Sequence, residues 1–140
     1  MGTWLAYPVV LGPGHVVDRP GLPHRSRSRS ASRPTHQFAP PSAGIGTPTL
    51  AETGLVLSSR LGRDSRDLVI RLIGEFSIEE VPFGDQHWRE AADAYLRFGK
   101  GRHKARLNFG DCLTYAVARL ANEPLLFVGD DFPETDLDLA

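Results

Sequence analysis

A helix–strand segment near the C-terminus constrains the fold of this 140-residue chain more than any other feature. A helix is expected from about Asp111 to Asn122, and the apolar run at residues 125–128 has the composition of a strand buried on both faces. This run is followed by Asp130 and Asp131. Strand ends and helix starts meet at one edge of an α/β sheet, so these aspartates are expected to converge with Asp111. Converging carboxylates indicate a site for Mg²⁺ or Mn²⁺, which prefer oxygen ligands.

The length of the chain indicates one domain with a single core. Its one cysteine, Cys112, excludes a disulfide framework and a multi-cysteine zinc site, and it fits a reducing compartment such as the cytoplasm. No apolar run approaches the roughly 20 residues needed to span a bilayer. The apolar start is broken by Pro8 and Pro13 and has no basic region, which argues against a signal peptide. We therefore expect a cytoplasmic location and no membrane partner.

The two parts of the chain differ in composition. Residues 1–46 hold seven prolines, five arginines and one aspartate, whereas residues 47–140 hold 16 acidic and 11 basic residues. The first part includes an arginine–serine run and shows no sustained apolar period, so we predict that 1–46 is largely irregular. The second part is predicted to be the folded domain.

Alternating helices and strands in residues 47–140 favour an α/β fold. Thr47 is expected to cap the first helix and Asp85 the third. The expected helices span about 47–61, 64–74, 85–98 and 110–121, and the expected strands span about 77–83 and 125–128. The predicted buried stripe of the third helix consists of Trp88, Ala91, Ala92, Tyr95 and Leu96.

Four segments carry a resemblance to a known family. They read TLAETG at 49–54, FGKGRH at 98–103, ARLNFGDC at 105–112 and EPLLFVGDDF at 123–132. In this order and spacing, over about two-thirds of the chain, they resemble the VapC group of PIN-domain ribonucleases, the toxins of bacterial toxin–antitoxin pairs.

The resemblance implies a PIN-like, Rossmann-like α/β/α sandwich with a parallel sheet. It also implies a metal-dependent endoribonuclease of a type II toxin–antitoxin module, with Mg²⁺ (or Mn²⁺) as cofactor. The implied partners are a cognate antitoxin, an RNA substrate and a second copy in a homodimer. Glu52, Asp111 and the turn that holds Asp130 and Asp131 match the acidic positions of the family, and either aspartate of the turn can face the metal.

The chain departs from the family at its start, where the family has a strand ending in an acid and then a helix. Residues 16–18 read Val-Val-Asp, but Arg19 and Pro20 follow, and an arginine–serine run replaces the helix. Asp18 lies 34 residues before Glu52, close to the family spacing, and is a candidate first metal ligand. Our hypothesis is that about residues 19–46 come from a shifted reading frame or a wrongly assigned start, so that the N-terminal strand and helix are degraded or missing.

Each acid has a structural alternative. Thr49 and Glu52 have the spacing of a capping box, and Asp111 favours a helix N-terminus through the helix dipole. Asp130 and Asp131 also suit an ordinary turn. Cys112 is interpreted as a small core residue rather than a nucleophile.

The glycine-punctuated basic loop at 97–106 is either a solvated surface loop or a source of contacts to RNA phosphates. Beside an acidic site that binds RNA, phosphate contacts are favoured. The residues expected to make them are Lys100, Arg102, His103, Lys104 and Arg106.

Three functions remain open from the sequence. The first is an active metal-dependent ribonuclease toxin. The second is a degenerate PIN domain without activity. The third is an RNA-binding module that uses the basic N-terminal segment.

Overall fold

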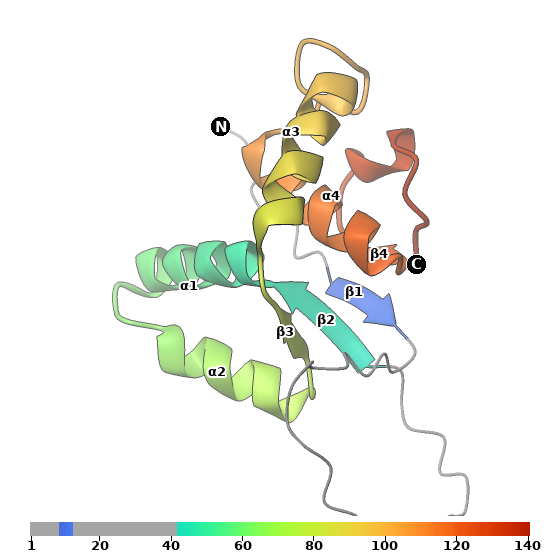
Figure 1. The fold of residues 1–140 in the computed structure, drawn as a ribbon. Coiled ribbons are helices and arrows are strands. Elements are labelled where there is room, and N and C mark those ends of the chain that lie inside the picture. The colour runs from blue at the N-terminus through green and yellow to red at the C-terminus, as the bar shows by residue number, and fades with distance from the viewer. Residues whose placement is uncertain (1–8, 13–41) are drawn as a thin grey trace, which may run out of the picture.

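The computed structural model describes residues 9–12 and 42–140, which form alternating short strands and helices (Figure 1). No helix within these ranges has the length and apolar character needed to cross a membrane. All four predicted helices are confirmed, and the two predicted strands are present but shorter. In chain order the elements are β1 (Val9–Gly12), β2 (Ser42–Gly46), α1 (Thr47–Leu61), α2 (Arg66–Glu75), β3 (Glu79–Val81), α3 (Asp85–Phe98), α4 (Phe109–Ala121), β4 (Leu125–Leu126) and a 3-10 turn, Phe132–Glu134.

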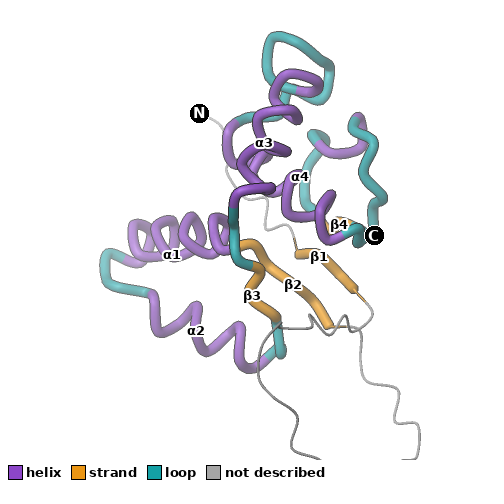
Figure 2. The backbone as a smooth tube through the Cα atoms, viewed as in Figure 1, coloured by secondary structure: helices purple, strands orange, loops and turns teal. Residues whose placement is uncertain are grey.

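The strands form one sheet in the order β3-β2-β1-β4 (Figure 2). β2 and β3 are parallel, with Gly44 opposite Glu79. β1 lies between β2 and β4 and is antiparallel to both, so Val10 faces Gly44 on one side and Leu125 on the other. β2, β3 and β4 therefore run in one direction, as an α/β fold with a parallel sheet predicts, and β1 is the exception.

Both β1 and β2 fall inside the segment 1–46 that was predicted to be largely irregular, and β2 leads directly into α1. The prediction was wrong for these strands because Ser42–Gly46, with the sequence SAGIG, has low intrinsic strand propensity. Its strand conformation comes from pairing with β1 and β3 on its two sides. The Val-Val-Asp segment at 16–18 and the arginine–serine run lie outside the described residues. The division of the chain at residue 46 stays a prediction.

The starts of α1 and α3 differ from the predicted caps. Gly46, rather than Thr47, is the N-cap of α1. Thr47 Oγ1 instead accepts a 3.2 Å hydrogen bond from Phe83 N, which ties the start of α1 to the chain after β3. Gly84 is the N-cap of α3, and Asp85 is the first helical residue.

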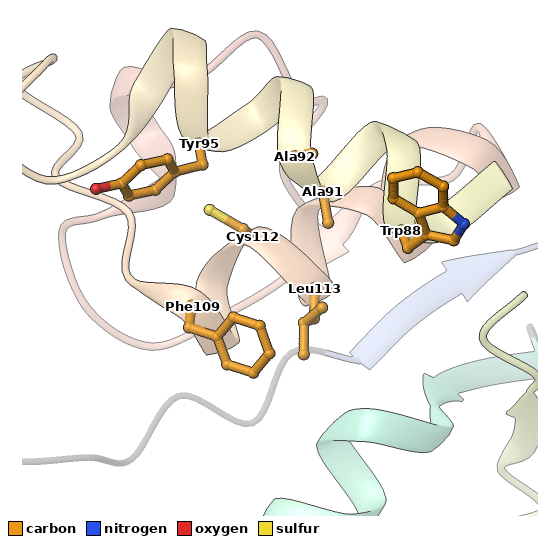
Figure 3. Close-up of a pocket in the computed structure, with 7 residues that line it drawn as sticks. All are labelled: Trp88, Ala91, Ala92, Tyr95, Phe109, Cys112 and Leu113. Carbon is orange, nitrogen blue, oxygen red and sulfur yellow. The ribbon is translucent and has the colours of Figure 1, made fainter. Parts of the chain in front are cut away.

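α3 packs against α4 through a face that shares only Ala91 with the predicted stripe (Figure 3). Ala91, Ala94 and Phe98 are buried, whereas Trp88 and Tyr95 remain about half exposed. The helices instead meet through alanines, whose small side chains leave less space between them, and the larger rings lie at the margin of the contact.

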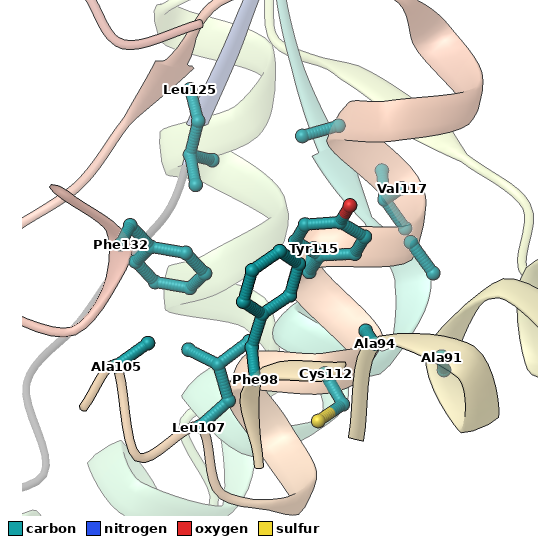
Figure 4. Packing of buried hydrophobic residues seen from close by; sticks show 12 residues of the cluster. Ala91, Ala94, Phe98, Ala105, Leu107, Cys112, Tyr115, Val117, Leu125 and Phe132 are labelled. Atoms are coloured by element: carbon teal, nitrogen blue, oxygen red, sulfur yellow. The ribbon is translucent and has the colours of Figure 1, made fainter. Parts of the chain in front are cut away.

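The main core lies where α3, α4, β4 and the C-terminal segment meet (Figure 4). Its largest fully buried side chains are Tyr115, Phe132, Leu107 and Leu125. Cys112 is buried as predicted, and burial raises the pKa of its thiol to about 11, so it is not a reactive thiolate. The core thus supports α4, whose first turn carries Asp111.

Candidate active site at the start of the fourth helix

Asp111 is held in place by the cap of its own helix. Asn108 is the N-cap of α4, and its Oδ1 accepts a 3.0 Å hydrogen bond from Asp111 N. In return Asp111 Oδ2 accepts a 2.8 Å hydrogen bond from Asn108 N. The capping role of Asp111 is therefore real, but it uses only Oδ2. Oδ1 accepts no hydrogen bond from any residue that the structure describes, so one oxygen of a buried and oriented carboxylate is available.

Glu52 reaches this helix start from α1. A Cβ built on Gly110 would lie 3.4 Å from Glu52 Oε2, which places the Glu52 carboxylate beside the backbone of the first turn of α4. One turn along, Thr49 Oγ1 and Thr114 Oγ1 are 3.4 Å apart and join the two helices. The alternative capping box of Glu52 is not formed, because α1 is capped at Gly46 without a side-chain hydrogen bond.

The turn after β4 brings a third carboxylate close enough for its charge to act on Asp111. Gly129 has φ 119°, a conformation that glycine adopts without strain, and it turns the chain before the two aspartates. Asp131 is half-buried and its charge acts on Asp111, whereas Asp130 is exposed and does not. Of the two alternatives that the sequence left open, Asp131 is favoured, because its charge acts on the Asp111 carboxyl.

The environment of Asp111 disfavours its charge. Burial is the largest effect that raises the pKa of the Asp111 carboxyl, and the negative charges of Asp131 and Glu52 raise it further. The hydrogen bond from Asn108 N opposes them by stabilising the carboxylate. A cation bound between these acids would favour the charged form of Asp111. Its positive charge would offset both the burial of the carboxylate and the repulsion from Asp131 and Glu52.

The donor chemistry fits a hard divalent cation, since all three side chains offer carboxylate oxygens. They do not enclose an ion as they stand: among residues 9–12 and 42–140, no three His, Cys, Asp or Glu side chains are grouped closely enough to hold a metal. The other acid that the sequence placed here, Asp18, lies outside the described residues.

The basic loop connects α3 to α4 at residues 99–107. Its two ends are held together by hydrogen bonds of 3.0 Å from Lys100 N to Leu107 O and from Leu107 N to Phe98 O. Lys100, Arg102 and Arg106 are exposed and form no ion pair within the described part of the chain. These three side chains are therefore available to an anionic ligand.

The other two residues predicted for RNA binding have contacts within the protein. Lys104 forms an ion pair with Glu134. His103 is half-buried, its Nδ1 accepts a 3.2 Å hydrogen bond from Ala105 N, and its ring packs edge-on against Phe98 with centroids 5.2 Å apart. The structure thus gives His103 a role in shaping the loop.

One polar network was missed by the sequence reasoning. Tyr115 Oη donates a 2.6 Å hydrogen bond to Asp136 Oδ1, and Arg97 Nη2 donates one of 2.6 Å to Asp136 Oδ2. Burial and the bond to Asp136 raise the pKa of Tyr115 to about 12. The network fastens the C-terminal segment to α3 and α4, and therefore supports the turn that carries Asp131. No local pattern signals it, because Asp136 and Tyr115 are 21 positions apart.

Comparison with known proteins agrees with this arrangement. The sequence profile described as PIN domain matches residues 31–137, which include Glu52, Asp111 and Asp131. The chain belongs to the PIN-domain family.

Curated relatives of this PIN-domain chain come from mycobacteria. It is 48% identical over 94 residues to "VapC ribonuclease Mb2004c" of Mycobacterium bovis and equally to "Ribonuclease VapC36" of Mycobacterium tuberculosis, covering 67% of this chain and 68% of each relative. It is 38% identical over 93 residues to "Ribonuclease VapC" of Mycolicibacterium smegmatis, covering 66% of this chain and 72% of that protein. The family resemblance found in the sequence is confirmed.

Proposed function

We propose that this PIN-domain chain is a divalent-metal-dependent endoribonuclease and the toxin of a type II toxin–antitoxin module. Its relatives at 36–48% identity are named as VapC ribonucleases, which supports hydrolysis of RNA phosphodiester bonds. The observation that carries the proposal is the approach of Glu52 and Asp131 to the buried carboxylate of Asp111.

Glu52, Asp111 and Asp131 would hold the ion, which we propose is Mg²⁺ or Mn²⁺. Asp130 remains a candidate at the exposed edge of the turn, and Asp18 remains a candidate outside the described residues. Bound there, a divalent ion offsets the charge that builds on the phosphate and lowers the pKa of a bound water. The backbone N–H of Asn108 orients Asp111 for this role.

Within the proposed complex the basic loop neutralises phosphates next to the site. Lys100, Arg102 and Arg106 are the residues we expect to do so, because they are exposed and unpaired among the described residues. Lys104 would have to leave Glu134 first. His103 contributes by holding the loop against Phe98.

We further propose a cognate antitoxin as the protein partner and a homodimer as the assembled form. Sedimentation velocity of the purified chain, alone and after co-expression with its antitoxin, tests both. A chain that sediments as a monomer at all concentrations would contradict the homodimer. Failure of the co-expressed antitoxin to co-sediment with the chain would contradict the antitoxin complex.

A catalytically inactive PIN domain is the second candidate. It is favoured by one observation, that the described acids do not form a closed group of three. In this case the chain would keep its fold and its protein partners but lack a complete metal site.

The two candidates are separated by a cleavage assay on single-stranded RNA with Mg²⁺ or Mn²⁺. The enzyme should lose activity with a chelator and in Asp111→Asn, which keeps the size of the side chain but removes its charge. A matched assay should use a chain whose residues 1–46 are replaced by the N-terminal segment of the M. tuberculosis relative. Cleavage by the replaced chain alone would identify the present one as inactive. Cleavage by Asp111→Asn at the parent rate would refute the assignment of Asp111.

A further inference from the structure

A cavity of 390 Å³ lies between α3 and α4, beside the first turn of α4 (Figure 3). Ligand pockets typically have volumes of about 300–1,000 Å³. Three aromatic rings border the cavity and stay open to solvent: Phe109 is 79% exposed, Trp88 51% and Tyr95 44%. Tyr95 and Phe109 lie at one end and Trp88 at the other. The complete lining is Trp88, Ala91, Ala92, Tyr95, Phe109, Cys112 and Leu113.

Two of the rings carry a stacked arginine. The Arg89 guanidinium carbon lies 4.5 Å from the Trp88 ring centroid, and that of Arg102 lies 5.5 Å from the Tyr95 ring centroid. Trp88 Nε1 also donates a 3.0 Å hydrogen bond to Asp85 Oδ1, which orients the indole. Arg89 also forms an ion pair with Asp85, 3.3 Å from Nε to Oδ2, whereas Arg102 has none among the described residues. The cavity thus combines apolar ring faces with the positive charge of Arg102 at the Tyr95 end. Proteins use this combination to bind single-stranded nucleic acids, stacking the bases on aromatic rings and pairing the phosphates with arginine.

The cavity is adjacent to the proposed catalytic acids. Phe109 and Cys112 line it, while Gly110 and Asp111, between them in the same helical turn, face Glu52 and Asp131. Arg102, stacked on Tyr95, belongs to the basic loop that we expect to contact phosphates. One turn of α4 therefore places an aromatic cavity on one face and the acidic site on the next.

We propose that this cavity binds a nucleobase of the RNA, at a nucleotide adjacent to the phosphate that is cleaved. The base stacks between the rings at the Tyr95 and Phe109 end, and Arg102 contacts the neighbouring phosphate. This inference rests on the proposed ribonuclease function. It adds that the residues lining this cavity help to determine which RNA sequence is cleaved. Phe109 is the main positioning contact, since it is the most exposed ring and lies two residues from Asp111.

The observations favour a nucleobase over a protein segment at this cavity. A larger groove of 710 Å³ lies between α1 and α2, with Leu55 and Ile70 exposed in its lining. No cation–π pair in the described residues involves that groove, and nothing in the structure shows what covers it. Stacked arginines and proximity to Asp111 distinguish the cavity between α3 and α4.

The test is equilibrium binding of a labelled single-stranded RNA oligonucleotide to the full chain in EDTA, where no metal-dependent cleavage occurs. Each oligonucleotide of a series carries a single abasic nucleotide, at a position that shifts by one from each oligonucleotide to the next. Fluorescence anisotropy should show one or two adjacent positions where loss of the base weakens binding roughly tenfold. Cleavage of the intact oligonucleotide with Mn²⁺ should fall within one nucleotide of them.

Phe109→Ala should weaken binding of the intact oligonucleotide roughly tenfold and remove its sensitivity to the abasic position. Tyr95→Ala provides a second variant with the same expected effect, since its ring lies at the same end of the cavity and is 44% exposed. Leu96→Ala is the matched control, because Leu96 is 61% exposed on α3 and does not line the cavity. It should bind like the parent.

Several results would overturn the proposal. One is the absence of measurable RNA binding, and another is an abasic profile unchanged in Phe109→Ala and Tyr95→Ala. A third is a dimer that these two variants dissociate and Leu96→Ala does not. The last result would show that a second copy covers the rings. An intact abasic profile without any cleavage would support the base site while contradicting the ribonuclease proposal, so the two failures are distinguishable.

Discussion

The Glu52 carboxylate lies against Gly110, where an added Cβ would be 3.4 Å from Glu52 Oε2. A bare Cβ at this distance makes ordinary van der Waals contact, but the branched side chain of Gly110→Val should displace Glu52 and weaken Mn²⁺ binding several-fold. Replacing a helical glycine should offset part of any loss of stability. Calorimetric titration with Mn²⁺ and thermal melts measure the two effects. Gly54→Val is the matched control, since nothing lies within 4 Å of an added Cβ at Gly54. Equal Mn²⁺ affinity in both variants would show that Glu52 is not at the site.

The two aspartates of the turn should differ in their effects. Asp131→Asn is expected to reduce metal-dependent cleavage by at least about a hundredfold, because it removes a charge that acts on Asp111. Asp130→Asn changes an exposed side chain and should reduce the rate only a few-fold. Single-turnover cleavage rates test this order, and the reverse order would mean that the turn rearranges when metal binds.

Stability in the absence of metal should depend on the charge of Asp111. Because its folded-state pKa is raised, chiefly by burial, the native chain holds this proton more tightly than the unfolded chain does. The charged Asp111 therefore lowers the free energy of unfolding at pH values above its pKa in the folded chain. This loss disappears as the pH falls below the pKa of the unfolded chain, about 3.9. Asp111→Asn should raise the free energy of unfolding at pH 7, with a gain that shrinks towards acid pH. Urea melts in EDTA measure it, and a gain independent of pH would contradict the assignment.

RNA binding should depend on the unpaired cations of the basic loop. Replacing Lys100 or Arg106 with glutamine is expected to weaken binding for all sequences alike and to reduce the slope of log K against log salt by about 0.7. Lys104→Gln should have a smaller effect, since Lys104 is engaged by Glu134. Anisotropy titrations over a range of salt concentrations provide the slopes. An effect of Lys104→Gln as large as that of Lys100→Gln would show that the ion pair opens on binding.

Loss of the Tyr115 hydroxyl should loosen the C-terminal segment. Tyr115→Phe keeps the buried ring and removes the 2.6 Å bond to Asp136, at a cost of about 1 kcal/mol. Burial raises the pKa of Asp136, but the bonds from Tyr115 and Arg97 outweigh it and lower the value. The parent and Tyr115→Phe should therefore differ most in free energy of unfolding above about pH 3.9. This difference should decline as the pH falls through the lowered pKa of Asp136. Tyr95→Phe, which removes no hydrogen bond within the described residues, should be neutral in the same denaturant melts.

Local signals in the sequence predicted the helices and the central acid. Gly62 and Asn122 both end a helix in the left-handed conformation, with φ 63° and 55°, so the stops of α1 and α4 were readable from residue type. Asp111 was identifiable because a helix start and a following strand end place it opposite the turn with Asp131. The sequence could not separate Asp131 from Asp130, since burial in the turn depends on packing around Phe132.

Other features depended on contacts between distant segments. β2 has two glycines in five residues and becomes a strand only through its neighbours in the sheet. The buried face of α3 was predicted only in part: Ala91 is buried as expected, but Ala94 is buried where Trp88 was predicted to be. Side-chain size predicts burial poorly where two helices approach closely.

Among the described strands, β1 alone joins β4 to β2 in the sheet. The elements that carry the three acids lie on opposite sides of β1. Glu52 follows β2 on one side, whereas Asp111 and Asp131 flank β4 on the other. A sub-global opening that breaks both β1 and the contact between α1 and α4 would therefore separate the carboxylates while each group of helices stays folded. Metal affinity would be lost at a lower denaturant concentration than helical circular dichroism. A bound ion, by bridging the two sides, would merge these two events into one cooperative transition.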